Sequence, residues 1–217
     1  MVFVSLKYKF IYIHIPRTAG TYMMDVFKGI YPQIKYYDTI KDNTGKSIDL
    51  AHLYYPIIER YIPPYMLNMY TKITTVRNPY DRIYSVYNLY TTGSRGTFAS
   101  EHPVSKEYKF KDFKEFVHKY IPPLYQLKAK DITTTNLHLI PQYHFLLDNN
   151  EKMIIDKIVK YENLEQLNDF FKKVKLNKTV QKNPVKHYFD KYDKEMIKII
   201  NKVYHLDFTM LAYDKLD

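Results

Sequence analysis

Arginine, threonine and glycine follow a short apolar run, residues 10–15, near the start of the chain. The turn after this run consists of Pro16, Arg17, Thr18, Ala19, Gly20, Thr21 and Tyr22. Arg17 supplies a permanent cation, and the two threonines supply hydroxyl donors. Gly20 lets the backbone turn sharply into a helix, whose first N–H groups lack intrahelical partners and favour negative charge. These residues predict a cradle for a phosphate or sulfate group.

A second arginine-bearing turn comes after residues 72–76, which are read as another short strand. Arg77 opens this turn, and Ser85 lies eight residues later, on the segment that should form the next helix. A hydroxyl at that spacing can reach the same anion as the guanidinium at the strand end. The two turns together suit a ligand with phosphate groups at both ends. Structural readings stay open, since Arg82 can pair with Asp81 or another surface carboxylate and Ser85 can be a small helix contact.

Each turn needs a strand before it and a helix after it. Residues 10–15 are apolar and β-branched, which is typical of a buried strand, and residues 1–15 as a whole are read as the first strand of the domain. Helical spacing follows the first turn up to Lys28, and the second turn from Tyr80 to Tyr90. Two such units predict an α/β fold with a mostly parallel sheet, whose ligands lie beyond the carboxyl ends of the strands.

The rest of the chain continues this alternation. Periodicity and proline positions predict strands at 34–37 and 154–161, and helices from Pro56 to a break at Pro63, at 113–120, through 164–174 and at about 190–204. Residues 91–109 carry no period and predict a long loop of the kind that closes over sites. Because no linker divides these segments, a single domain over residues 1–217 is expected.

Charge and composition limit the partners and the compartment. Lys and Arg number 33 against 23 Asp and Glu, a net charge of +10, which favours an acidic partner, although an AT-rich genome gives the same lysine bias. Without cysteine there is no disulfide or thiolate site. The apolar start of the chain is divided by Lys7 and Lys9 and lacks a cleavage site, and no run reaches the length of a membrane span. A soluble, cytoplasmic protein is expected.

Two motifs carry a family resemblance. IHIPRTAGTYM at residues 13–23 and VRNPYDRIYSVY at residues 76–87 resemble the paired signatures of the carbohydrate sulfotransferases, which include the heparan and chondroitin sulfotransferases. The Pro141–Gln142 pair, YENL at residues 161–164 and the segment 204–213 are also similar. The resemblance implies a three-layer, P-loop-like α/β fold with a central, mostly parallel sheet flanked by helices. It also implies 3′-phosphoadenosine 5′-phosphosulfate as the donor, and no metal.

The resemblance assigns roles to single residues. Residues 16–22 correspond to the turn that binds the 5′-phosphosulfate, whereas Arg77 and Ser85 correspond to the residues that bind the 3′-phosphate. The family usually has lysine where this chain has Arg17. In the family, that lysine stabilises the leaving group. His52 corresponds to the catalytic base, and a loop histidine without function is the competing interpretation. His138 is a second candidate, for the base or for contact with the substrate, and Gln142 is a weaker candidate for contact with the substrate. His14 is read as a core histidine of the first strand.

These implications predict transfer of a sulfuryl group to an acceptor hydroxyl, with a carbohydrate as the expected acceptor and 3′-phosphoadenosine 5′-phosphate as the product. No metal ligands at characteristic spacing are found among the histidines, and nucleic acid is not the expected partner. One alternative is a catalytically silent module that binds anions or nucleic acid on the same fold. Another is a P-loop-type kinase, which should carry G-x-x-x-x-G-K-[ST] and a magnesium-binding carboxylate, and the first turn has neither.

Overall fold

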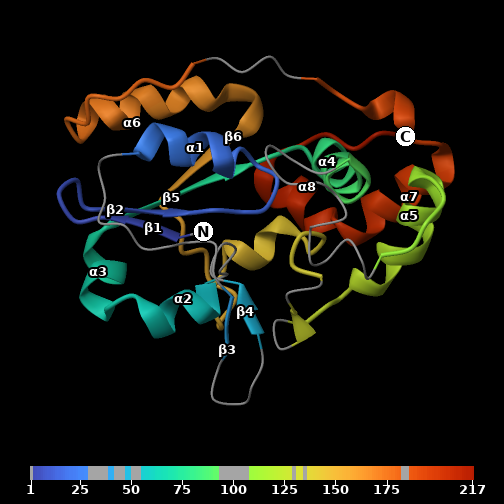
Figure 1. Cartoon of the computed structure of the whole chain (residues 1–217), viewed down its shortest axis with the longest axis horizontal. Coiled ribbons are helices and arrows are strands. Elements are labelled where there is room, and N and C mark those ends of the chain that lie inside the picture. Colours follow the sequence, from blue (N-terminus) through green and yellow to red (C-terminus); the bar gives the residue numbers. More distant parts are fainter. Residues whose placement is uncertain are drawn as a thin grey trace. The chain divides into compact units, whose positions relative to one another are not determined.

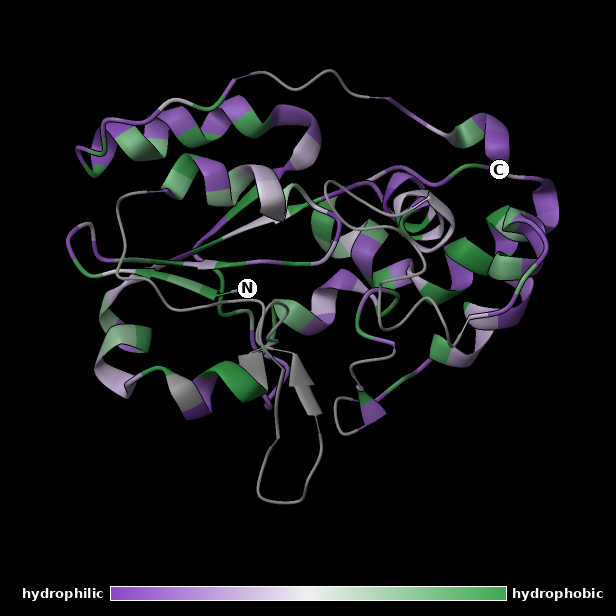
Figure 2. Cartoon of the chain, in the orientation of Figure 1, coloured by the Kyte–Doolittle hydropathy of each residue, from purple (hydrophilic) through white to green (hydrophobic). Residues whose placement is uncertain are grey.

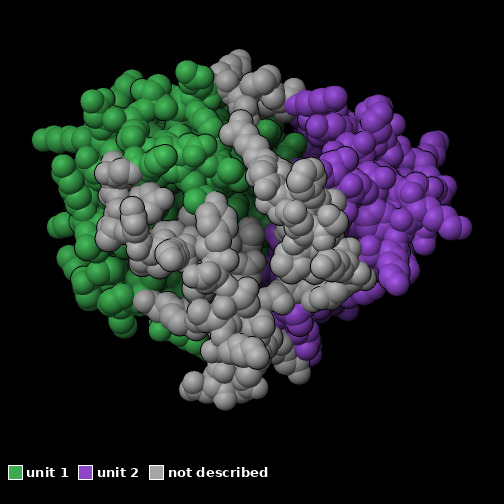
Figure 3. Space-filling view, in the orientation of Figure 1, with its two compact units in different colours: residues 1–77, 144–185 green, residues 78–143, 186–217 purple. Residues whose placement is uncertain are grey.

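The computed structural model describes residues 2–28, 39–41, 47–49, 55–92, 108–128, 131–133, 136–181 and 186–217. The chain divides into two compact units (Figure 3). Unit 1 contains residues 1–77 and 144–185, and unit 2 contains residues 78–143 and 186–217. The expectation of one domain over the whole chain stays a prediction.

Unit 1 is built on a four-stranded sheet with the order β1-β2-β5-β6 (Figure 1). The strands are β1 (Val2–Ser5), β2 (Phe10–Ile13), β5 (Thr71–Val76) and β6 (Lys157–Lys160). β2, β5 and β6 are parallel, and only the edge strand β1 pairs in the antiparallel sense. The α/β fold with a central, mostly parallel sheet is therefore confirmed.

Helices lie on both faces of this sheet (Figure 1). The helices are α1 (Gly20–Phe27) and α6 (Leu167–Lys173) on one face, and α2 (Tyr55–Tyr61) and α3 (Pro64–Met69) on the other. The buried side chains of Phe10 and Tyr12 on β2 join Phe27 and Phe171 in one core cluster. Their neighbours along the strand point to the opposite face, because side chains alternate along a strand.

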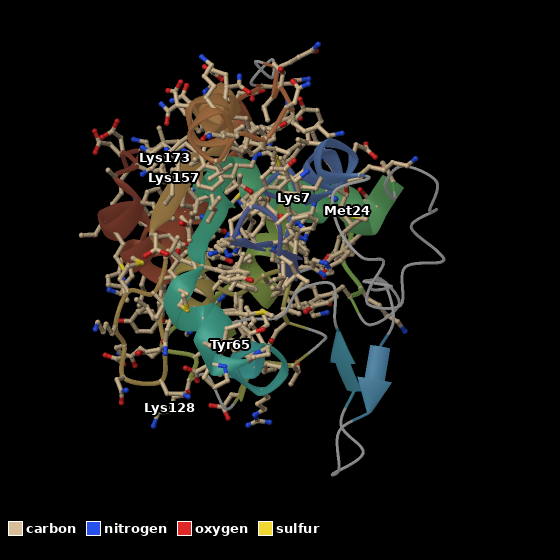
Figure 4. The ribbon with its side chains drawn as sticks, turned by 90° about the vertical axis from the view of Figure 1, so that its left-hand side faces the viewer. Lys7, Met24, Tyr65, Lys128, Lys157 and Lys173 are labelled. Carbon is tan, nitrogen blue, oxygen red and sulfur yellow. The ribbon has the colours of Figure 1, made fainter. Side chains whose placement is uncertain are left out.

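The prediction of one strand over residues 1–15 is wrong, because this segment forms a hairpin. Residues 6–9 turn between β1 and β2, and Lys9 takes a left-handed conformation with φ 51°. The Ser5 hydroxyl accepts a hydrogen bond from the Tyr8 N–H at 3.3 Å and stabilises the turn. Lys7, which Figure 4 labels, is an exposed side chain of this turn.

Of the other predictions for unit 1, some are confirmed and others differ from the structure. The helix break at Pro63 is confirmed, since α2 ends at Tyr61 and α3 starts at Pro64. A short antiparallel pair, β3 (Thr39–Lys41) and β4 (Ser47–Asp49), was not expected. The helix predicted through 164–174 begins as a 3-10 helix, η6 (Tyr161–Gln166), and continues as α6. The strand predicted at 34–37 lies outside the described residues, as do residues 93–107 of the predicted loop.

Unit 2 is helical. Its helices are α4 (Pro79–Thr92), α5 (Phe113–Tyr120), α7 (Lys194–Val203) and α8 (His205–Leu211). It also contains the 3-10 helices η3 (Pro122–Leu124) and η7 (Phe189–Lys191). A further 3-10 helix, η5 (Gln142–Phe145), begins in the residues of unit 2 and ends in those of unit 1. Figure 2 shows polar and apolar stripes on α5 and α7, which is the pattern of helices that cover a core.

Side-chain caps set the starts of two of these helices. Asp112 accepts a hydrogen bond from the Glu115 N–H at 2.8 Å at the start of α5, and Asp193 accepts one from the Met196 N–H at 2.9 Å at the start of α7. Because Asp193 caps the helix, α7 begins four residues later than the prediction of about residue 190. α8 was not predicted.

Candidate anion-binding site

The turn between β2 and α1 has an unusual backbone. Arg17 has φ 66° and Ala19 has φ 83°, so left-handed residues stand on both sides of Thr18. Left-handed conformations in such a turn direct successive N–H groups into one concavity, which binds anions. Each costs a non-glycine residue roughly 1–3 kcal/mol, and such strain is concentrated at binding sites. No acidic side chain lies in the first turn of α1.

The His14 imidazole lies directly against Gly20. A Cβ at position 20 would stand only 1.8 Å from His14 Nε2, so no residue with a side chain fits without displacing the ring. Gly20 is therefore needed for this close approach at the start of α1. The expectation of a core histidine within the strand is wrong, because His14 follows β2, is half-buried and packs on the turn.

A chain of buried hydroxyl groups anchors the turn to the sheet. Thr18 donates to the Ile15 carbonyl at 2.8 Å, so its single proton is used there. In the 3.2 Å contact between the Thr75 and Thr18 hydroxyl groups, Thr75 must therefore be the donor. The Tyr12 hydroxyl in turn donates to the Thr75 hydroxyl at 2.6 Å. The Thr18 hydroxyl is buried and donates to the backbone, and its expected role as a donor to the anion stays a prediction.

The remaining side chains of the turn differ in exposure. Thr21 is exposed on the first turn of α1, and Pro16 is buried. Tyr22 is half-buried, and its hydroxyl accepts a hydrogen bond from the Gln181 N–H at 3.0 Å. The Tyr22 ring therefore holds the chain after α6 against α1.

Arg77 reaches the same turn from the neighbouring strand. β2 and β5 are parallel with Ile13 opposite Thr74, so the residues after both strands lie at the same edge of the sheet. Arg77 Nη1 donates to the Arg17 carbonyl at 3.5 Å. Its guanidinium carbon lies 4.4 Å from the centre of the Tyr161 ring, and Arg77 is only 8% exposed. The structure thus brings Arg77 to the turn that carries Arg17, within unit 1.

Ser85 and Arg82 belong to unit 2. Ser85 is buried on α4, and its expected approach to the same phosphate as Arg77 stays a prediction. Arg82 is fully buried and donates to the carbonyl oxygens of His138 at 3.1 Å, Leu139 at 3.4 Å and Ile140. The reading of Arg82 as the partner of a surface carboxylate is therefore wrong.

His138 and Gln142 lie in the core of unit 2. The backbone N–H of Gln142 donates to Asp207 at 2.8 Å, and the Tyr143 N–H donates to the same carboxylate at 2.9 Å. Burial raises the pKa of Asp207. His138 is nearly fully buried with its ring edge-on to Tyr90. The contacts observed for Gln142 are structural, and contact of either residue with a substrate stays a prediction.

A comparison with protein families identifies the chain. The pattern of one family, described as the sulfotransferase family, matches residues 1–214. The chain belongs to the sulfotransferase family. Membership indicates a transferase that moves sulfuryl groups, and the family resemblance predicted from the two motifs is confirmed at this level. A search of curated proteins gives no match.

The expected catalytic base of this sulfotransferase-family protein has no observed position. His52 lies outside the described residues. Among the residues that the structure describes, no three or more His, Asp or Glu side chains form a group that could hold a metal ion. No helix in the described part of the chain is long and apolar enough to cross a membrane.

The sequence of this sulfotransferase-family protein does not reveal which residues from distant segments contact Arg77 and Asp81. Tyr161, under Arg77, was noticed only as part of a family motif. In unit 2, the buried Asp81 carboxylate accepts hydrogen bonds from His187 Nδ1 at 2.6 Å and from the Tyr188 N–H at 2.9 Å. His187 follows Asp81 by 106 residues, and no local pattern connects them.

Proposed function

We propose that this protein transfers a sulfuryl group from 3′-phosphoadenosine 5′-phosphosulfate to a hydroxyl group of a carbohydrate. The observation that carries the proposal is the strained turn at residues 16–20, with left-handed Arg17 and Ala19, set directly beside the guanidinium of Arg77. Backbone N–H groups and two arginines at one sheet edge suit a ligand with several anionic groups.

The residues present fit the phosphosulfate group of this donor. The N–H groups of the turn and of the start of α1 can donate hydrogen bonds to anionic oxygens, without competition from an acidic side chain in that first helical turn. When bound, the donor supplies a sulfuryl group whose departure leaves negative charge on a phosphate oxygen. Arg17 is the cation of the turn, and its role in the proposal is to stabilise that charge.

Arg17 stands where the family usually has lysine. A guanidinium keeps the positive charge at every working pH and grips two oxygens with a planar fork, whereas an ammonium acts as a compact point charge. In the proposal Arg17 preserves the binding of the phosphosulfate. The substitution also supports the second candidate function, a silent module that binds the nucleotide without transferring sulfuryl.

The acceptor hydroxyl must lose a proton while its oxygen forms a bond to sulfur. His52 is the proposed base, on the strength of its position between the two cofactor motifs and of an imidazole's pKa near neutrality. A carbohydrate acceptor is supported by the motif resemblance, and the net charge of +10 is compatible with an anionic glycan.

A transfer assay tests this function. The full chain is incubated with donor labelled in the sulfuryl group and a panel of glycans, with peptides and duplex DNA as other acceptors. Label in a glycan, lost in His52→Ala while binding of 3′-phosphoadenosine 5′-phosphate persists, supports both the reaction and the base. Binding of that nucleotide without transfer to any acceptor favours the silent module.

A further inference from the structure

We propose that Tyr161 positions Arg77, and that Arg77 in turn supports the phosphosulfate turn, so that one guanidinium serves both ends of the donor. The inference rests on the proposed function and adds to it a positioning residue and a coupling between the two anion sites. Its three members, Tyr161, Arg77 and Arg17, are all described residues of unit 1.

The sheet register places Tyr161 beside Arg77. β5 and β6 are parallel with Val76 opposite Lys160, so the next residue of each strand, Arg77 and Tyr161, leaves the sheet at the same level. Tyr161 starts η6, packs against the core cluster of unit 1 and precedes the fully buried Leu164. The ring is therefore held by the core, and the guanidinium carbon sits 4.4 Å from its centre.

Burial strengthens this contact. Arg77 is only 8% exposed, so little water competes with the ring for the guanidinium. A cation on an aromatic face gains more when it is desolvated, and a flat guanidinium stacks where an ammonium cannot. The ring face, and not the tyrosine hydroxyl, is the part of Tyr161 that the contact uses.

The other end of the guanidinium meets the turn. Arg77 Nη1 donates to the Arg17 carbonyl at 3.5 Å, a long contact that is chiefly electrostatic. The Arg17 carbonyl and the Thr18 N–H share one planar peptide group, so a contact that orients the carbonyl also orients that N–H. The hydroxyl of Thr18 is fixed from the side of the sheet by Ile15 and Thr75. A guanidinium has five N–H donors, which allows it to serve a carbonyl and a phosphate together.

Two ligands separate the two effects of Arg77. 3′-Phosphoadenosine 5′-phosphate engages both anion sites, whereas adenosine 5′-phosphosulfate lacks the 3′-phosphate and tests the turn alone. If Arg77 acts only on the 3′-phosphate, Arg77→Lys leaves the affinity for adenosine 5′-phosphosulfate unchanged. We expect Arg77→Lys to weaken both ligands, because lysine keeps the charge and loses the fork and the stacking.

Calorimetric titration of the full-chain variants provides the test. Tyr161→Leu should weaken both ligands by roughly five- to thirty-fold, which corresponds to a cation–π contact of ~1–2 kcal/mol. Tyr161→Phe keeps the ring and should recover this loss. Tyr65→Leu is the matched control, because Tyr65 is 56% exposed on α3 (Figure 4). If Tyr161→Leu does not fold, by circular dichroism and thermal unfolding, Arg77→Lys with adenosine 5′-phosphosulfate carries the test.

Each outcome decides one question. Wild-type affinity in Tyr161→Leu, or equal losses in Tyr161→Leu and Tyr161→Phe, overturns the role of the ring. An unchanged affinity of Arg77→Lys for adenosine 5′-phosphosulfate overturns the coupling to the turn. Failure of the wild-type chain to bind either ligand overturns the proposed function, and the inference with it.

Discussion

At the scale of single residues, the proposed anion-binding turn, residues 16–20, depends on one cation and on one residue without a side chain. Arg17 supplies the charge at the turn, and Gly20 leaves the space that the His14 ring fills. The first contribution needs a cation, and the second needs the absence of a Cβ.

Substitution of Arg17 should separate charge from geometry. Arg17→Lys keeps the cation, so we expect its affinity for 3′-phosphoadenosine 5′-phosphate to stay within about threefold of wild type. Arg17→Gln loses the cation that stabilises the leaving oxygen, so its kcat/KM for sulfuryl transfer should fall by about a hundredfold or more. Steady-state kinetics and titration measure both. Equal kcat/KM in wild type and Arg17→Gln would remove Arg17 from the chemistry.

Gly20→Ala should disturb the turn through His14. The added Cβ would lie 1.8 Å from Nε2, so the ring must move, and we expect a loss of about 1–3 kcal/mol in the free energy of unfolding. The double variant Gly20→Ala/His14→Ala removes the clash and should show a favourable coupling energy in chemical denaturation. Additive losses from the two substitutions would show that the ring does not cause the effect.

At the scale of elements, the hydroxyl chain from β2 through β5 to the turn fixes the turn on the sheet. Thr75→Val removes the middle of the chain and leaves the buried Tyr12 hydroxyl without this partner, which should cost about 1–3 kcal/mol in the free energy of unfolding. Tyr12→Phe in the same background removes that buried polar group and should regain part of the loss. Urea denaturation of the wild type and of the two variants measures this. If the double variant is less stable than Thr75→Val, the Tyr12 hydroxyl does not depend on Thr75 as its partner.

Elements with strong local patterns could be predicted, and those defined by distant contacts could not. β5 follows from a run of β-branched residues before Arg77, and α5 follows from helical spacing that ends before Pro122. The hairpin at residues 6–9 was missed because Leu6 and Tyr8 continue the alternation of a strand. In the site, the cation and the glycine follow from residue types. The Thr18 hydroxyl, the Tyr161 ring and the Asp81–His187 pair depend on partners that only the folded chain supplies.

At the scale of the whole molecule, stability should depend on the protonation of His144. Burial lowers the pKa of His144 to about 4, below the ordinary value of 6.5, so the unfolded chain binds its proton more readily than the folded chain. This contribution to stability is present above pH 6.5 and is lost as the pH falls towards 4. Its full size is on the order of 3 kcal/mol.

Denaturation of wild type and His144→Phe across this range isolates that contribution from the carboxyl groups, which titrate in both. We expect the free energy of unfolding of wild type to fall more steeply than that of His144→Phe between pH 6.5 and 4. Parallel curves would mean that His144 accepts a proton equally well in the folded and unfolded chain.

The proposed function requires that the strained turn and Arg77 form a site for the donor nucleotide. Titration of the full chain with 3′-phosphoadenosine 5′-phosphate, in competition with ATP and with duplex DNA, tests it most directly. We expect binding in the micromolar range that neither competitor displaces at equal concentration. Binding of ATP or DNA, with none of 3′-phosphoadenosine 5′-phosphate, would contradict it.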